Sequence, residues 1–166
     1  MLVINLYGGP GSGKSTTAAG LFFLMKQRLC RAELITEYAK ELTYENADMS
    51  NQLAILSEQE QRLRRLVGKV DYAVTDAPLL LSNVYAPKEF CNKEFVSLTK
   101  HLYSQYDNFN VFLTRAKPYA RYGRSQTEAE AKALDNTIHG LLDSWHLTIP
   151  GNVRAPERIA RAIGKF

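Results

Sequence analysis

The chain has 166 residues, of which 45% are hydrophobic and 23% charged. These proportions are typical of a soluble globular protein and exclude disordered, collagen-like and disulfide-framework chains. At this length, one domain spanning residues 1–166 buries enough apolar surface to fold without a metal or disulfide, whereas two domains would each be too small. The isolated cysteines, Cys30 and Cys91, form no metal-binding spacing and favour a reducing cytoplasm. The net charge of +4 predicts only a mild preference for anionic partners.

No apolar run approaches the roughly 18 residues that a membrane-spanning helix needs. The first residues, 1–7, carry neither a basic segment nor a cleavage signal. We therefore expect an unprocessed cytoplasmic protein without a membrane segment.

Strand-like apolar runs alternate with helical periodicities along the chain. Strands are expected at residues 2–7, 32–36, 70–75, 110–114 and 146–150. Helices are expected at residues 14–29, 37–45, 50–67 and 92–106, after Thr127, and from Pro156 to Gly164. This alternation predicts a three-layer α/β fold, with a parallel sheet of about five strands and helices on both faces.

The apolar spacing also predicts which helix faces are buried. In the first helix the buried side chains are expected to be Ala18, Leu21, Phe22, Met25 and Leu29. In residues 50–67 they are Leu53, Leu56, Leu63 and Val67, with Arg62, Arg64 and Arg65 mostly on a solvated opposite face. Thr127 and Glu130 form a capping-box signature that opens a helix with an apolar stripe of Leu134, Ile138, Leu141 and Leu142.

One motif, between the first strand and the first helix, indicates the class of protein. Residues 8–15 match G-x-x-x-x-G-K-[ST], the phosphate-binding P-loop or Walker A motif. Its glycines let backbone N–H groups surround phosphate oxygens, and the following helix adds its positive N-terminal dipole. We expect Lys14 to reach the β- and γ-phosphates of ATP and Ser15 to bind Mg²⁺. The expected nucleotide-binding residues are Gly8, Gly9, Pro10, Gly11, Ser12, Gly13, Lys14, Ser15 and Thr16.

A P-loop alone does not separate kinases from GTPases and motor ATPases. A GTPase needs a D-x-x-G switch and an N-K-x-D base-reading motif. Here the third strand ends in residues 75–78, Thr-Asp-Ala-Pro, and the only Asn-Lys pair continues with Glu94. Motor ATPases of the AAA type carry a further helical lid domain, for which this length leaves little room. A DNA-associated P-loop ATPase is therefore the second alternative, behind a kinase.

Arginines are concentrated in residues 115–126, where apolar residues become rare. In phosphoryl transfer, kinases close a mobile loop that brings guanidinium groups over the charge of the transferred phosphoryl group. We therefore predict that residues 115–126 form a lid in which Arg115, Arg121 and Arg124 contact phosphates. The alternative is a solvated charged segment.

Two carboxylates follow predicted strands. Asp76 ends the third strand, at the edge where sheets of this kind bind ligands, and is expected to hold Mg²⁺ or to accept the proton of an acceptor hydroxyl. Glu37 follows the second strand and is the other candidate for the general base. The structural alternatives are a turn cap for Asp76 and an ordinary first-turn acid of a helix for Glu37.

These segments resemble the small P-loop kinases, which include nucleoside monophosphate kinases, deoxynucleoside kinases and the nicotinamide riboside kinase domain. The resemblance covers nearly the whole chain, through LYGGPGSGKSTTA, ITEYAKEL, VTDAPLL and FLTRAKPYARYGRSQTEAEA. It implies that Glu37 is the catalytic base, paired with Tyr38 as in the nicotinamide riboside kinase domain. It also implies that Asp76 corresponds to the Asp of the Asp-Arg pair of thymidylate kinases. Because Ala77 replaces that arginine, the favoured acceptor is a hydroxyl without a neighbouring phosphate, or one whose phosphates are held elsewhere, as in a DNA strand.

In size and lid pattern the chain resembles phage-encoded kinases that phosphorylate the hydroxymethyl group of 5-hydroxymethyluracil in DNA. This resemblance implies ATP and Mg²⁺ as cofactors and a nucleoside-type acceptor within DNA. The residues compatible with DNA contacts are Arg62, Arg64 and Arg65 for the strand and Tyr38, Tyr119 and Tyr122 for base stacking. A free nucleoside or a nucleoside monophosphate is the alternative acceptor.

Overall fold

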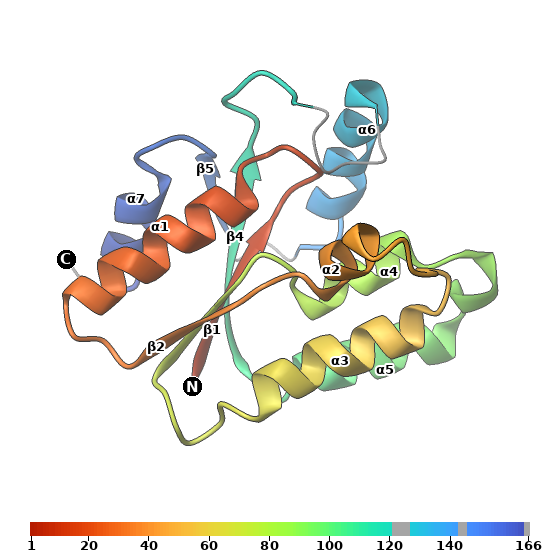
Figure 1. Ribbon diagram of the computed structural model, residues 1–166, viewed down its shortest axis with the longest axis horizontal. Coiled ribbons are helices and arrows are strands. Elements are labelled where there is room, and N and C mark those ends of the chain that lie inside the picture. Colours follow the sequence, from red (N-terminus) through yellow and green to blue (C-terminus); the bar gives the residue numbers. More distant parts are fainter. Residues whose placement is uncertain (121–126, 143–145, 165–166) are drawn as a thin grey trace.

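Five parallel strands form the central sheet of the computed structural model (Figure 1), which describes residues 1–120, 127–142 and 146–164. The strands are β1 (Leu2–Tyr7), β2 (Ala32–Ile35), β3 (Tyr72–Thr75), β4 (Asp107–Thr114) and β5 (Leu147–Pro150), in the order β2-β3-β1-β4-β5. β1 is central, with Leu2 paired to Tyr72 on one side and to Asp107 on the other. Its nearly continuous apolar run suits a strand that is covered on both faces.

Helices cover both faces of the sheet, which confirms the predicted three-layer α/β fold. On one face, α1 (Lys14–Gln27) and α7 (Ala155–Ala162) share a core with β1, in which Leu21 and Ile159 contact the same cluster as Ile4. The other helices are α2 (Tyr38–Tyr44), α3 (Gln52–Arg64), α4 (Ser82–Tyr85), α5 (Lys93–Tyr103) and α6 (Glu128–His139), with short 3-10 turns at Leu79–Leu81 and Lys88–Phe90. On the second face, α3 and α5 pack over Val3 and Ala73, and α6 packs over Tyr7.

Three buried-face predictions are wrong. Leu29 is 92% exposed because α1 ends at Gln27 and the chain turns through a left-handed conformation at Leu29, with φ of 56°. Leu53 and Val67 are about half exposed because α3 buries the adjacent stripe instead and ends before Val67. The buried stripe of α3 consists of Gln52, Ile55, Leu56, Gln59, Glu60 and Leu63.

The capping box that opens α6 is confirmed. The Glu130 backbone N–H donates to the Thr127 hydroxyl, and the Thr127 N–H donates to the Glu130 carboxylate. α6 ends at Gly140, so Leu141 and Leu142 lie beyond the helix and are partly exposed. Within the described ranges no helix combines the length and apolar character needed to cross a membrane.

Candidate phosphate-binding and acceptor site

The P-loop lies where its motif requires, between the end of β1 and the start of α1. Gly13 caps α1 in the left-handed region, with φ of 99°, and a Cβ there would lie 3.0 Å from the Gly151 carbonyl oxygen. Glycine is therefore required on both conformational and steric grounds. Ser15 and Thr16 follow in the first turn of α1 and are exposed. The loop and the helix N-terminus together form the cradle that phosphate binding needs.

Lys14 is folded back onto its own loop. Its Nζ donates to the Gly8 carbonyl at 2.7 Å and to the Gly9 carbonyl at 3.3 Å. Burial lowers the pKa of Lys14, and the nearby carboxylates of Glu37 and Asp76 oppose that shift. The structure thus brings together the lysine and both carboxylates that the sequence singled out.

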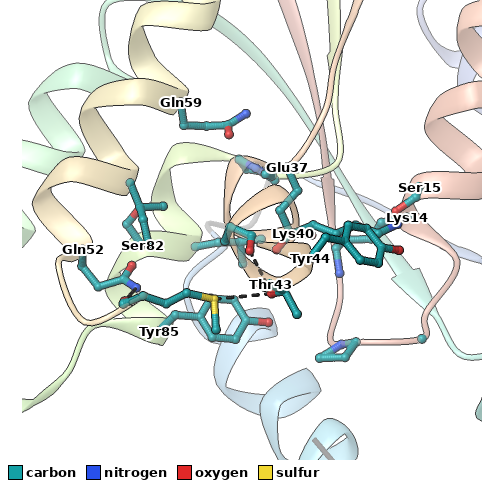
Figure 2. Close-up of a pocket in the computed structure, with 18 of the residues that line it drawn as sticks. Lys14, Ser15, Glu37, Lys40, Thr43, Tyr44, Gln52, Gln59, Ser82 and Tyr85 are labelled. Atoms are coloured by element: carbon teal, nitrogen blue, oxygen red, sulfur yellow. Dashed lines mark hydrogen bonds between the residues drawn. The ribbon is translucent and has the colours of Figure 1, made fainter. Parts of the chain in front are cut away.

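A cavity of about 480 Å³ extends from the P-loop between α2, α3 and α4; we call it the acceptor cavity (Figure 2). Its volume is in the range of small-molecule sites. Figure 2 shows Lys14 and Ser15 at one end and Gln52 and Ser82 at the other. Its lining residues are Pro10, Gly11, Gly13, Lys14, Ser15, Thr16, Glu37, Ala39, Lys40, Thr43, Tyr44, Met49, Gln52, Ile55, Gln59, Ala77, Pro78, Leu81, Ser82 and Tyr85.

Glu37 lines the acceptor cavity from the N-cap position of α2, where its side chain makes no capping hydrogen bond. Burial raises the pKa of Glu37, the Lys14 ammonium opposes that shift, and Asp76 adds to it. A carboxylate with a raised pKa beside the phosphate cradle has the properties of a general base.

Gln59 holds Glu37 in place through the backbone, and the sequence analysis did not identify it. Its amide accepts from the Tyr38 N–H at 3.2 Å and donates to the Thr36 carbonyl at 3.3 Å, so it binds the residues on both sides of Glu37. Gln59 is only 4% exposed. The available sequence signal was a polar residue at helical spacing between Leu56 and Leu63.

Asp76 lies just beyond the end of β3 and is 4% exposed. Its Oδ1 is buried, and among the described residues it has no hydrogen-bond partner. A buried unpartnered carboxylate oxygen close to Lys14, the residue before Ser15, fits the oxygen ligands that Mg²⁺ prefers. The described residues contain no cluster of three or more His, Cys, Asp or Glu that could hold a metal. Such a site suits an ion held largely by nucleotide phosphates.

Arg115 braces the P-loop instead of lying free above it. Its Nε donates to Asp135 Oδ2 at 2.6 Å, its Nη1 to the Pro10 carbonyl at 2.7 Å, and its Nη2 to the Ala131 carbonyl at 2.8 Å. Arg121 and Arg124 lie outside the described residues. The phosphate-contacting role of these three arginines therefore stays a prediction, as does the lid at residues 115–126.

Asp135 is the second residue of the site that the sequence analysis missed. Besides binding Arg115, its Oδ1 accepts the Gly9 backbone N–H at 2.6 Å. Asp135 lies on the inward face of α6, between the buried residues Ala131 and Ile138, and only the fold reveals its partners.

The expectation of a solvated face is wrong for Arg62. Its guanidinium binds Glu41 at 2.6 Å and Glu58 at 2.9 Å, its side chain is 14% exposed, and it lies 5.1 Å from the centroid of the Tyr38 ring. Arg62 and Tyr38 therefore tie α2 to α3 and are not free to contact a DNA strand. Arg64 is exposed but paired with Glu60 at 2.7 Å.

The remaining residues suggested for DNA contact give little further support. Arg65 is exposed. The Tyr119 ring centroid lies 6.0 Å from the guanidinium of Arg115, the residue that binds the P-loop. Tyr122 lies outside the described residues.

Comparisons with known proteins agree with this fold. A family model described as an AAA domain matches residues 3–150. The APS kinase CysC of Mycobacterium tuberculosis, solved with AMPPNP and APS, is similar in structure, with a TM-score of 0.51 and 16% identity over 98% of this chain and 95% of that one. Kti12 of Chaetomium thermophilum, solved with ADP-AlF3, has a TM-score of 0.60 and 12% identity over 98% and 97% of the two chains.

No curated protein matches the chain significantly. The family model nevertheless spans the P-loop, both candidate carboxylates and, apart from Leu2, all five strands. The two structural similarities extend over nearly the whole of each chain and show the same fold. The chain belongs to the AAA domain family and has the three-layer α/β fold of P-loop kinases and related P-loop NTPases.

Proposed function

We propose that the protein is a phosphotransferase that moves the γ-phosphoryl group of ATP to a hydroxyl of an acceptor bound in the acceptor cavity. One observation carries this proposal: P-loop residues and Glu37 line the same cavity of about 480 Å³. A phosphate cradle that opens directly into a space of small-molecule size, with a carboxylate on its wall, provides what transfer to an acceptor requires.

In this reaction Glu37 accepts the proton of the acceptor hydroxyl as its oxygen bonds to the γ-phosphorus, and the bond to the β–γ bridging oxygen breaks to leave ADP. Lys14 leaves its carbonyl partners and stabilises the charge on the transferred group. Ser15 and Asp76 would hold Mg²⁺, which neutralises phosphate charge when bound. An acceptor that fills the cavity would displace competing water from the transferred group.

The end of the acceptor cavity away from the P-loop supports a nucleoside-type acceptor. Among the described lining residues it presents hydroxyl and amide groups, such as Ser82 and Gln52, and no charged side chain. Tyr44 and Met49 line the cavity and are 57% and 38% exposed, so they suit a planar base. We propose the hydroxymethyl group of 5-hydroxymethyluracil in DNA as the first acceptor, with a free nucleoside or nucleoside monophosphate as the alternative.

Incubation with γ-labelled ATP and Mg²⁺ tests this proposal. The candidate acceptors are free nucleosides, nucleoside monophosphates, unmodified DNA and DNA containing 5-hydroxymethyluracil. We expect label on the hydroxymethylated DNA alone. Label on a nucleoside or monophosphate would keep the reaction and replace the acceptor, whereas no label on any of them would contradict the phosphotransferase assignment.

Membership of the AAA domain family favours a second function, a DNA-associated ATPase. The two functions differ in what happens without an acceptor, because a kinase whose site excludes water hydrolyses ATP only slowly until the acceptor binds. We expect phosphate release below about one tenth of the transfer rate. Rapid hydrolysis that DNA stimulates, with no phosphate appearing on DNA or nucleoside, would establish the ATPase instead.

A further inference from the structure

Asp135 of α6 binds the P-loop and Arg115 with the same carboxylate. Oδ1 accepts the Gly9 N–H at 2.6 Å, and Oδ2 accepts Arg115 Nε at 2.6 Å. Arg115 also donates to Pro10, the residue after Gly9, so the pair closes a ring of hydrogen bonds around the first turn of the loop. This network joins three parts of the chain: the P-loop, the residue that follows β4, and α6.

The contact between α6 and the loop is unusually close. A Cβ on Gly9 would lie 2.6 Å from both Asp135 Oδ1 and the Ala131 carbonyl oxygen, and 2.8 Å from Arg115 Nη2. Glycine at position 9 is therefore needed for the approach of α6. Asp135 and Arg115 are 19% and 15% exposed, so solvent screens their pairing only in part.

We propose that Asp135 is a positioning residue for the nucleotide site, which fixes the Gly9 peptide and Arg115 so that the P-loop is held in one conformation for phosphate. The inference rests on the proposed binding of ATP to the P-loop. Asp135 lies close enough to the P-loop to influence the pKa of Lys14. Because its carboxylate and a phosphate are both negative, Asp135 does not itself attract phosphate. Its contribution to phosphate binding comes from holding the loop.

Geometry and charge predict opposite effects when the carboxylate is neutralised. An amide at position 135 leaves Arg115 without a counter-charge beside an anion site, which by charge alone would tighten ATP binding. With its oxygen on the Gly9 N–H, the amide turns its NH2 group toward Arg115 Nε, so that two donors face each other and the bond to Arg115 Nε is lost. Weaker binding in Asp135→Asn would therefore isolate the positioning effect.

The experiment measures the affinity of Mg²⁺·ATP and of tripolyphosphate by calorimetry. We expect Asp135→Asn to weaken both by roughly tenfold, the equivalent of one hydrogen bond. The double variant Arg115→Gln/Asp135→Asn should bind no more weakly than the weaker single variant, because the two residues act together. If Asp135→Asn folds poorly, Arg115→Lys is the second variant. It keeps the positive charge but loses the two-point contact with Asp135, and it should also weaken binding.

Glu128→Gln is the matched control. It removes one carboxylate from the same helix. That carboxylate pairs with Lys132 at 2.8 Å on the surface, so both affinities should be unchanged. Unchanged or tighter binding in a folded Asp135→Asn protein would overturn the inference while wild-type binding upholds the nucleotide site. Failure of the wild-type protein to bind ATP would overturn the proposed function and this inference together.

Discussion

Burial and neighbouring charges shift the pKa values of Lys14 and Glu37 in the site. Burial lowers the pKa of Lys14 and raises that of Glu37, so each is pushed toward its neutral form, while their opposite charges favour ionisation. Asp76 opposes the shift at Lys14 and adds to the shift at Glu37. Because these effects partly oppose one another, the binding of an anionic nucleotide is expected to change the interactions of both Lys14 and Glu37.

Lys14→Ala should abolish phosphoryl transfer, with a loss of at least about 10²-fold in kcat, because it removes the charge that stabilises the transferred group. The fold should survive, since Lys14 binds loop carbonyls and fills no part of the apolar core. Transfer assays and circular dichroism on the same preparation check both expectations. Wild-type activity in a folded Lys14→Ala protein would exclude the kinase assignment.

Glu37 and Asp76 should respond differently to amide substitution. Glu37→Gln should lower kcat by roughly 10²- to 10⁴-fold and leave ATP affinity nearly unchanged, because the amide keeps the shape and loses the proton acceptor. Asp76→Asn should weaken the apparent Mg²⁺ affinity, and a higher Mg²⁺ concentration should restore part of the rate. Rate measurements across a Mg²⁺ series distinguish these outcomes; equal and metal-independent losses would show that the roles are assigned wrongly.

At the scale of elements, the acceptor cavity depends on how α2 is held against α3. α2 has no buried residue of its own, so hydrogen bonds replace apolar packing at this contact. Arg62 of α3 binds Glu41 of α2, and Gln59 of α3 binds the backbone on both sides of Glu37. These contacts of Arg62 and Gln59, which we call the α2–α3 clamp, therefore fix the wall of the cavity that carries the candidate base.

Arg62→Ala should reduce the free energy of unfolding by about 1–3 kcal/mol, because it leaves two carboxylates without their shared partner and removes the stacking on Tyr38. Arg64→Ala, on the same helix, removes one partner of Glu60, which keeps its hydrogen bond from the Tyr106 hydroxyl, and should therefore cost less. Urea unfolding of the two variants measures the difference. Equal costs would show that the contacts of Arg62 contribute no more than the single Arg64–Glu60 pair.

At the scale of the whole molecule, the site lowers stability to obtain its chemistry. Burying Glu37 raises its pKa above the value in the unfolded chain, so the folded state binds that proton more tightly. The free energy of unfolding therefore falls as the pH rises from the ordinary carboxyl value through the raised value. A destabilising contribution of this kind is expected for a residue that is retained for function and not for folding.

Glu37→Gln should accordingly be more stable than the wild-type protein at neutral pH, by roughly 2–4 °C in Tm. The advantage should shrink as the pH falls toward 4, where the wild-type carboxyl is protonated in both states. Thermal melts over this pH range provide the measurement. A Glu37→Gln variant that melts below the wild type at pH 7 would contradict the assignment of burial as the dominant influence on Glu37.

Much of the fold and part of the site could be predicted from local sequence. The P-loop occupies eight consecutive residues between a strand and a helix, and the strand positions follow from short apolar runs. The failures were local as well: Leu29 continued a helical period, but the helix ended two residues earlier. Periodicity measures the spacing of apolar side chains and does not locate the end of a helix.

By itself, the sequence determined the α/β class, the phosphate cradle and the two carboxylates at strand ends, because each depends on residues close together in the chain. Only the tertiary structure decided that Arg115 braces the P-loop, that Arg62 is enclosed by carboxylates, and that Asp135 holds Gly9. Gly9 and Asp135 are 126 positions apart. They meet because the strand order places β4 beside β1 and α6 over both, an arrangement set by the packing of the whole sheet that no local pattern encodes.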